Sequence, residues 1–334
     1  MARKKQQKAN ASGKIFLFFI SIVLISGFIT YSFIFQKKSV DYTLSIKKGD
    51  TVSAIANKLK SAGIIQSSDL FKALIKYTAD DTKIAVGMYK ITGDLSLYEV
   101  VQKITYGTPD MVSITFLEGW NFKQIRGALN KNTMLTHTSE SMTDEQIKIF
   151  LKINYPRVEG LIYPSTYFIA PQQSDLEVLQ MAKNTMQDKL STIWASRESN
   201  LNYTTAYELL TMASLVQKEV SSVTDMQMVA TVFNNRLAKN MRLQDDPAVF
   251  YGLDNRAVIT RADFKTDTPY NTYMHNGLPS TPICSPGDDA LIASAHPNGD
   301  KKLLYFIATK EGKTIYTTNY DDHSKAVNQY LRKK

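Results

Sequence analysis

Cysteine is almost absent from this chain, since Cys284 is the only one among 334 residues. An intrachain disulfide is therefore impossible, and a metal cluster held by several thiolates is excluded. Any part of the chain outside the cytoplasm would have to be stabilised by its hydrophobic core alone. Because Cys284 lies between Ile283 and Pro286, we interpret its thiol as a packed side chain rather than a nucleophile.

Several common functional motifs are missing as well. The histidines at 275, 296 and 323 show no His-x-x-x-His spacing, and no serine lies in a Gly-x-Ser-x-Gly elbow. We therefore expect no metal, no cofactor and no serine nucleophile. The formal net charge is +9, but much of the excess lies in residues 1–14 and the rest is spread thinly. Without a basic stripe interleaved with aromatic residues, a nucleic-acid partner is not expected.

One long apolar run, Ile15–Phe35, carries no charged residue. A helix of this length, at about 1.5 Å per residue, spans the ~30 Å hydrocarbon core of a bilayer. A cleaved signal peptide has a shorter apolar centre, and the only small-residue pair, Ser26-Gly27, lies in the middle of this run. We predict an uncleaved single-pass anchor in the cell membrane. The basic residues before it outnumber Lys37 and Lys38 after it, so the amino terminus should be cytoplasmic and everything from about Gln36 onward extracytoplasmic.

The remaining patterns predict an α+β protein with a small module followed by a larger domain. In the module we expect a strand at 40–48, a helix from Val52 capped by Asp50 or Thr51, a helix at 68–77, an extended stretch at 83–91 and a helix at 96–104. The predicted divisions are a basic tail at 1–14, a transmembrane helix at 15–35, the module at 40–109 and a mixed α+β domain at 110–334. The run 46–56 resembles the opening of a LysM module, a family that binds glycan chains; a generic strand, turn and helix is the alternative.

The larger domain shows strong helix signals. Capping-box spacing is present at Thr143 with Gln146, at Ser174 with Glu177 and at Thr205 with Glu208. We expect the following elements: a strand at 112–116, helices from 121 and from 143, an aromatic turn at 159–168, helices at 174–197, 205–220 and 225–240, a polar loop at 241–252, a helix at 289–295, a hairpin at 304–317 and a helix at 322–331.

Glu219 is the most informative residue of this domain. Leu209, Met212 and Val216 share one face of the predicted helix, and Glu219 is the next position on that face. An apolar surround raises the pKa of a carboxyl group, which is the state that a general acid needs near neutral pH. The alternative is a solvated side chain at a frayed helix end, since buried carboxylates are rare.

From residue 159 onward the sequence resembles the YceG-like family, the endolytic murein transglycosylases called MltG. The resemblance is carried in order by Glu159-Gly160, Met212-Ala213-Ser214, Lys218-Glu219, Asn235-Arg236-Leu237, Met241-Arg242-Leu243-Gln244, Asp246-Pro247, Tyr251-Gly252, Tyr270-Asn271-Thr272-Tyr273, Gly277-Leu278-Pro279, Pro286-Gly287, Ala295-His296-Pro297 and Tyr305-Phe306.

The resemblance implies cleavage of the β-1,4 bond between N-acetylmuramic acid and N-acetylglucosamine inside peptidoglycan strands, with a 1,6-anhydro end as product. It implies that Glu219 is catalytic and that partners include peptidoglycan synthases and division or elongation proteins. The chain departs from the family at Gln217, which should be tolerable because the catalytic position is the second acid. It also departs at Ser165, Ser280-Thr281 and Ser285, which puts the shape of two substrate loops in doubt but not the reaction. Candidates for the sugar-binding shell are Gln244, Asp246, Asn235, Arg236, Tyr270, Asn271 and Tyr273.

Alternatives remain open at this point. Arg236 and Asp246 could form a structural ion pair, and the Tyr and Asn residues could only fix loops. The whole chain could be a wall-binding scaffold without activity. It could also be a muramidase that uses water, with Asp245 or Asp246 as a second carboxylate.

Overall fold

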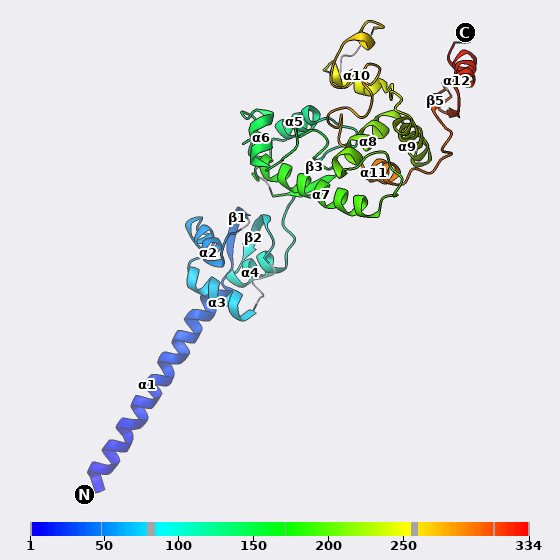
Figure 1. Ribbon diagram of the computed structural model, residues 1–334. Coiled ribbons are helices and arrows are strands. Elements are labelled where there is room, and N and C mark those ends of the chain that lie inside the picture. The colour runs from blue at the N-terminus through cyan, green and yellow to red at the C-terminus, as the bar shows by residue number, and fades with distance from the viewer. Residues whose placement is uncertain are drawn as a thin grey trace. The chain divides into compact units, whose positions relative to one another are not determined.

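The computed structural model describes residues 2–47, 49–78, 84–170, 172–254, 260–309 and 311–332 (Figure 1). The chain divides into two compact units. The first consists of Met1–Val112 with Phe168–Pro171, and the second of Ser113–Tyr167 with Gln172–Lys334. Helices and strands alternate irregularly along both units, which makes the fold a mixed α+β structure.

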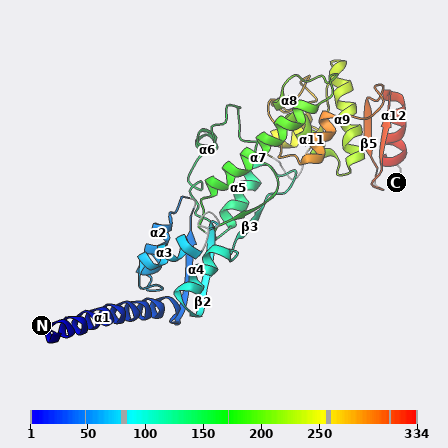
Figure 2. The same ribbon diagram turned by 90° about the horizontal axis from the view of Figure 1, so that it is seen from below.

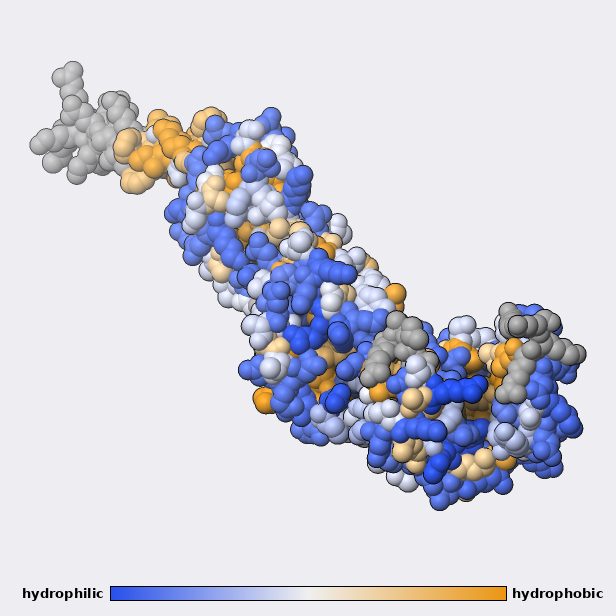
Figure 3. Space-filling view, turned by 90° about the horizontal axis from the view of Figure 1, so that it is seen from above, coloured by the Kyte–Doolittle hydropathy of each residue, from blue (hydrophilic) through white to orange (hydrophobic). Residues whose placement is uncertain are grey.

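The first unit begins with a long helix, α1 (Ala2–Phe35). Its segment Phe16–Phe35 has a mean hydropathy of 2.3 and is long and apolar enough to cross a membrane. Figure 3 shows the coloured part of this helix as mainly hydrophobic. A membrane anchor and a signal sequence share this property, so the helix itself is established and its use as an anchor remains a prediction.

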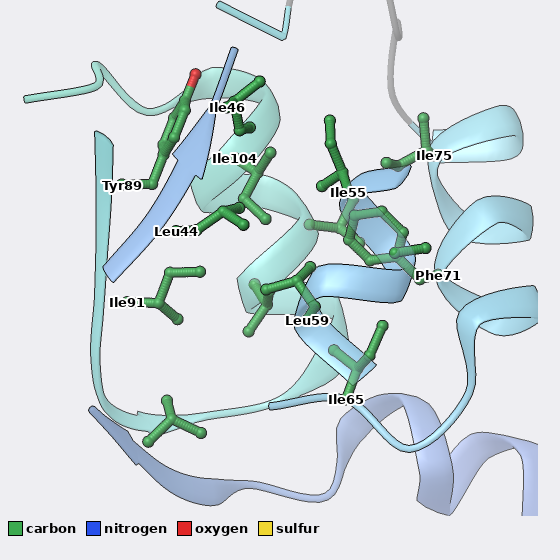
Figure 4. Packing of buried hydrophobic residues seen from close by; sticks show 14 residues of the cluster. Leu44, Ile46, Ile55, Leu59, Ile65, Phe71, Ile75, Tyr89, Ile91 and Ile104 are labelled. Carbon is green, nitrogen blue, oxygen red and sulfur yellow. The ribbon is translucent and has the colours of Figure 1, made fainter. Parts of the chain in front are cut away.

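A small α+β module follows α1. Its strands β1 (Lys38–Ile46) and β2 (Gly87–Leu95) are antiparallel, with Ile46 opposite Gly87. The helices α2 (Val52–Ser61), α3 (Ser68–Thr78) and α4 (Leu97–Tyr106) supply the other buried side chains. Figure 4 shows Leu44, Leu59, Phe71 and Ile91 among the side chains that fill this core. Whether the module is a LysM module stays a prediction.

Hydrogen bonds at the helix starts explain where the module's helices begin. The side chain of Thr51 accepts from the backbone N–H of Ala54 and caps α2, as one of the two expected caps. The other candidate, Asp50, instead accepts from the backbone N–H of Lys47 at 2.8 Å and from Lys58 Nζ. The strand β2 begins later than the predicted stretch at 83–91, and Lys83 lies outside the described residues.

The second unit is mainly helical, and α8 is its central helix. Every side chain from Leu209 to Val216 is buried, so α8 is covered on all sides rather than on one face. Helices α7, α9, α10 and α11 contact it (Figures 1 and 2). The helices are α5 (Phe122–Lys131), α6 (Asp144–Phe150), α7 (Asp175–Ser196), α8 (Ala206–Glu219), α9 (Val223–Ala238), α10 (Asp246–Gly252), α11 (Asp288–Ala295) and α12 (Tyr320–Val327).

Two short sheets complete the fold. Strand β3 (Val112–Thr115) pairs with β4 (Thr166–Ile169), and β5 (Tyr305–Ala308) forms the expected antiparallel hairpin with β6 (Thr314–Thr317). In Figure 2 strand β5 lies between α9 and α12, and it contacts both.

Three predictions about local structure are wrong. The polar loop at 241–252 contains helix α10, because Asp245 caps its start and Pro247 fits the first turn. The side chain of Ser174 accepts from the backbone N–H of Leu176 instead of forming a capping box with Glu177. The aromatic turn at 159–168 ends in strand β4, whose pairing with β3 is a long-range contact that local patterns do not reveal.

Candidate active site

Glu219 is the last residue of α8, and the start of that helix fixes its position. The hydroxyl of Thr205 accepts from the backbone N–H of Glu208, whose carboxylate accepts from the backbone N–H of Thr205 at 3.0 Å. This is the predicted capping box. At the other end Val220 adopts an extended conformation and ends the helix, which leaves Glu219 half-buried. The carboxyl group therefore stands at the rim of a rigid, buried helix.

The nearest partner of Glu219 is a second carboxyl group, that of Asp245. The two carboxyl groups lie close enough for the protonated form of one to donate a hydrogen bond to the other. Asp245 is fully buried, and its Oδ2 accepts from the backbone N–H of Ala248 at 2.7 Å, which caps α10. The backbone N–H of Asp245 donates to Thr272 Oγ1 at 2.8 Å. The site is thus a pair of carboxyl groups at the meeting point of α8 and α10.

Burial is the main cause of the electrostatic character of this pair. It raises the pKa of Glu219; the interaction with the Asp245 carboxyl group lowers that pKa in part, and the negative charge of Asp246 raises it. Burial also raises the pKa of Asp245, well above the usual range for an aspartate, and the neighbouring Glu219 adds to that shift. Two carboxyl groups this close in a poorly solvated place do not both ionise readily. The pair can therefore hold a proton at a pH where exposed carboxyl groups have lost theirs.

Three of the predicted shell residues lie beside this pair. Asp246 is exposed, and its Oδ1 accepts from the hydroxyl of Tyr273 at 2.5 Å. Burial raises the pKa of Tyr273, and the charges of Asp246, Asp245 and Glu219 raise it further. Gln244 is exposed in a left-handed backbone conformation with φ of 52°. Binding of a polar ligand by these three side chains stays a prediction.

Tyr270 and Asn271 lie in the same loop as Tyr273, but their polar atoms are used within the protein. Asn271 is buried, and its Nδ2 donates to the carbonyls of Phe264 and Thr266 at 3.1 and 2.8 Å. Its Oδ1 accepts from the backbone N–H of Tyr273. The hydroxyl of Tyr270 is hydrogen-bonded to Thr281 Oγ1 at 2.8 Å. Both residues thus fix the loop that presents Tyr273.

Asn235 and Arg236 are on α9 and are also buried. The Nδ2 of Asn235 donates to the carbonyls of Asp300 and Leu303. The guanidinium of Arg236 donates to the carbonyls of Leu304 and Leu243, both at 2.6 Å. In the part of the chain that the structure describes, backbone carbonyls therefore take the place of the ion pair with Asp246 considered above.

The contact with Leu243 gives Arg236 an indirect connection to the site, because Leu243 lies two residues before Asp245. Its guanidinium also lies over the ring of Tyr305, 5.0 Å from the centroid. Arg236 therefore joins the hairpin strand β5 to the segment that carries Asp245. A direct contact of Arg236 or Asn235 with a sugar stays a prediction.

Two further residues of the site were not predicted to have a role. Glu159 is buried and accepts from the backbone N–H of Phe122 and from the hydroxyl of Tyr251 at 2.9 Å, which connects α5 with α10. Burial raises the pKa of Glu159 to about 7. Gln217 Oε1 accepts from the backbone N–H of Gly287 at 2.9 Å, at the start of α11. The family resemblance draws attention to both positions in the sequence, but it does not reveal these contacts.

The surroundings of Cys284 agree with the expectation from the sequence. Cys284 is buried, and its thiol donates to the carbonyl of Ser214, so it is a packed side chain. Among the described residues there is no group of three or more His, Cys, Asp or Glu side chains that could hold a metal ion.

Known proteins are similar to this chain over most of its length. The YceG-like family matches residues 44–329. The endolytic murein transglycosylase of Bacillus subtilis is 31% identical over 87% of this chain and 85% of its own length. That of Streptococcus pneumoniae is 27% identical over 96% of this chain, which spans 65% of that relative.

A solved structure points to the same family as these relatives. The crystal structure of a YceG-like protein from Listeria monocytogenes is 26% identical, with a TM-score of 0.52, and the likeness covers 85% of this chain and 98% of that one. Together with the family match over most of the sequence, these likenesses decide the classification. The chain is a member of the YceG-like family.

Proposed function

We propose that this protein is a peptidoglycan lytic transglycosylase that cleaves the β-1,4 bond between N-acetylmuramic acid and N-acetylglucosamine inside glycan strands and leaves a 1,6-anhydro end. Two family relatives are named endolytic murein transglycosylases. The observation that carries the proposal is the half-buried Glu219, with a raised pKa, at the end of a rigid helix. A group in that state can donate a proton near neutral pH.

One acid suffices for this reaction because the nucleophile belongs to the substrate. Glu219 gives its proton to the bridging oxygen while the bond from that oxygen to the anomeric carbon breaks. The 6-hydroxyl of the same sugar attacks the anomeric carbon, and Glu219 takes up the hydroxyl proton. Tethering gives that hydroxyl a high effective concentration. Protons balance over the cycle, and no water is consumed.

The burial of Asp245 argues against the muramidase alternative. A second carboxylate that activates water needs room for that water beside the sugar. Asp245 is 0% exposed, and its Oδ2 is already bonded to the backbone of α10. Asp246 is exposed, but it accepts from the hydroxyl of Tyr273. We assign Asp246, Tyr273 and Gln244 to sugar binding, and Tyr270, Asn271, Asn235 and Arg236 to the support of that surface.

The apolar segment of α1 would determine where in the cell the enzyme acts. We propose that Phe16–Phe35 remains attached as a single-pass anchor, with the basic residues before it in the cytoplasm and the small module and the second unit outside. The enzyme would then act on new strands close to the membrane, where peptidoglycan synthases and division or elongation proteins are its expected partners. Glycan binding by the LysM-like module would assist it; a scaffold that only binds glycan is the competing function.

The test compares Glu219→Gln with the wild type on purified glycan strands, with products identified by mass spectrometry. We expect anhydro ends from the wild type, no cleavage by Glu219→Gln, and unchanged binding of strands by that variant. Glu177→Gln, an exposed glutamate on α7, is the matched control and should cleave normally. Activity retained in Glu219→Gln would rule out the mechanism, and reducing ends heavier by one water would identify a muramidase.

A further inference from the structure

Among the polar side chains of this site, Asp245 is fully buried. It shows no exposed surface, and its Oδ2 and backbone N–H are both bonded within the protein. Its Oδ1 is buried without any N–H or hydroxyl partner among the described residues. The carboxyl group of Glu219 lies within hydrogen-bonding reach of the Asp245 carboxyl group, so the unpartnered Oδ1 is available for a bond between the two. A buried oxygen left without a partner is unfavourable, so this contact needs an explanation.

A hydrogen bond between two carboxyl groups requires a proton, because ionised carboxylates only accept. The charged or titratable groups that face the pair are Asp246, Tyr273 and, toward Asp245, Cys284. Lys218, the neighbour of Glu219 in sequence, directs its Nζ to the carbonyl of Gly119 at 3.4 Å. The surround is thus acidic or neutral, which favours retention of one proton by the pair.

We propose that Asp245 is a positioning residue for the reaction proposed above, on which this inference rests: its buried carboxyl group and that of Glu219 share one proton and act as a single acid. The proton belongs to the pair, and Glu219 delivers it to the sugar. The cap that Asp245 forms on α10 fixes its own carboxyl group, which in turn orients that of Glu219.

This arrangement suits a residue that must be an acid first and a base second. Once Glu219 has given the proton to the bridging oxygen, two carboxylates face each other in a poorly solvated place. Their repulsion raises the proton affinity of Glu219, which then removes the proton from the 6-hydroxyl as that oxygen bonds to the anomeric carbon. The pair begins and ends the cycle with one proton.

The test is Asp245→Asn in the full-length chain in detergent micelles. Asparagine caps helices as well as aspartate does, so α10 should be retained. Its neutral amide can donate to Glu219 but cannot share a proton with it. The matched control is Asp254→Asn, an exposed position after α10 with φ of 56°, a conformation that asparagine tolerates.

The first readout is the pH dependence of kcat/KM for strand cleavage. We expect the alkaline limb of Asp245→Asn to move to lower pH, with about a tenfold loss at neutral pH for each pH unit of movement, and recovery on acidification. The loss should fall on kcat rather than on KM. Asp254→Asn should match the wild type. An alkaline limb that stays in place in Asp245→Asn would overturn the proposal.

The second readout does not require activity. Carbon-13 NMR of the wild type, labelled in glutamate and aspartate carboxyl groups and assigned with Glu219→Gln, should show Glu219 and Asp245 reporting one common titration step above the usual range of carboxyl groups. Two carboxyl groups that are both ionised at pH 6, or that titrate independently, would contradict the pair. If the common step is present but the wild type forms no anhydro ends, the pair stands and the proposed reaction fails.

Discussion

The two units differ in what they bury. In the described part of the first unit the buried polar side chains are Ser96 and Thr105, and the rest of its core is apolar. The second unit buries several ionisable and amide side chains, some of them at the candidate active site: Glu159, Asp175, Asn234, Asn235, Arg236, Asp245, Asp263 and Asn271. Buried polar groups are costly unless they are paired, so a chain retains them where geometry matters more than stability. The comparison suggests that the second unit gives up stability to hold its loops and its acid in place.

Among the substitutions that test this comparison, the one at Arg236 is expected to have the largest effect on stability. Its replacement by alanine removes a donor from the buried carbonyl of Leu243 and from the part-buried carbonyl of Leu304. At about 1–3 kcal/mol for each carbonyl, the free energy of unfolding of the second unit should fall by about 2–6 kcal/mol. Urea unfolding measures this change. Arg261→Ala, at an exposed position, should cost less than about 0.5 kcal/mol. If the two variants were equally stable, the hydrogen bonds of the buried Arg236 side chain would not contribute to the stability of the second unit.

A smaller effect, which depends on pH, is expected at Glu159. Its pKa rises from 4.5 to about 7 on folding, mainly through burial. The stability that this group contributes is therefore complete below pH 4.5 and is lost as the pH rises through 7. Glu159→Gln stays neutral, so its stability relative to the wild type should improve by about 1–3 kcal/mol between pH 5 and pH 8. Urea unfolding at both pH values tests this, with Glu177→Gln as a control that should show no such trend.

The smallest effect is expected at the helix caps, where the two units should behave alike. Thr51→Ala and Thr205→Ala each remove one side-chain acceptor from a helix start. Each should cost its own unit about 1 kcal/mol, because a cap acts locally. Hydrogen exchange at the amides of Ala54 and Glu208 measures the loss, and serine at either position should restore it. A cost confined to one unit would mean that these caps depend on the surrounding core.

The sequence predicted well what depends on neighbours along the chain. The capping boxes at Thr143 and Thr205, the apolar face of α2 and the hairpin of β5 with β6 are all encoded by short-range spacing. Helix α10 was missed because its polar start reads as a loop. The aspartate before Asp246-Pro247 was the signal that could have revealed it.

The site was predicted only in part, because patterns along the sequence do not show which distant segments meet in the fold. The helical period placed Glu219 on a buried face, and burial does raise its pKa. The partner Asp245 comes from a distant segment, and the contact depends on how α10 packs against α8. Likewise, the carbonyls that take up the donors of Asn235 and Arg236 belong to segments that only the tertiary fold brings near. Spacing along one helix cannot reveal such contacts.

The most direct test of the central claim follows oxygen during strand cleavage. If the sugar's own 6-hydroxyl attacks while Glu219 recovers its proton, digestion of glycan strands in water enriched in heavy oxygen should give anhydro ends that contain none of the label. Labelled reducing ends from the wild-type protein would mean that water is the nucleophile, and would contradict the account.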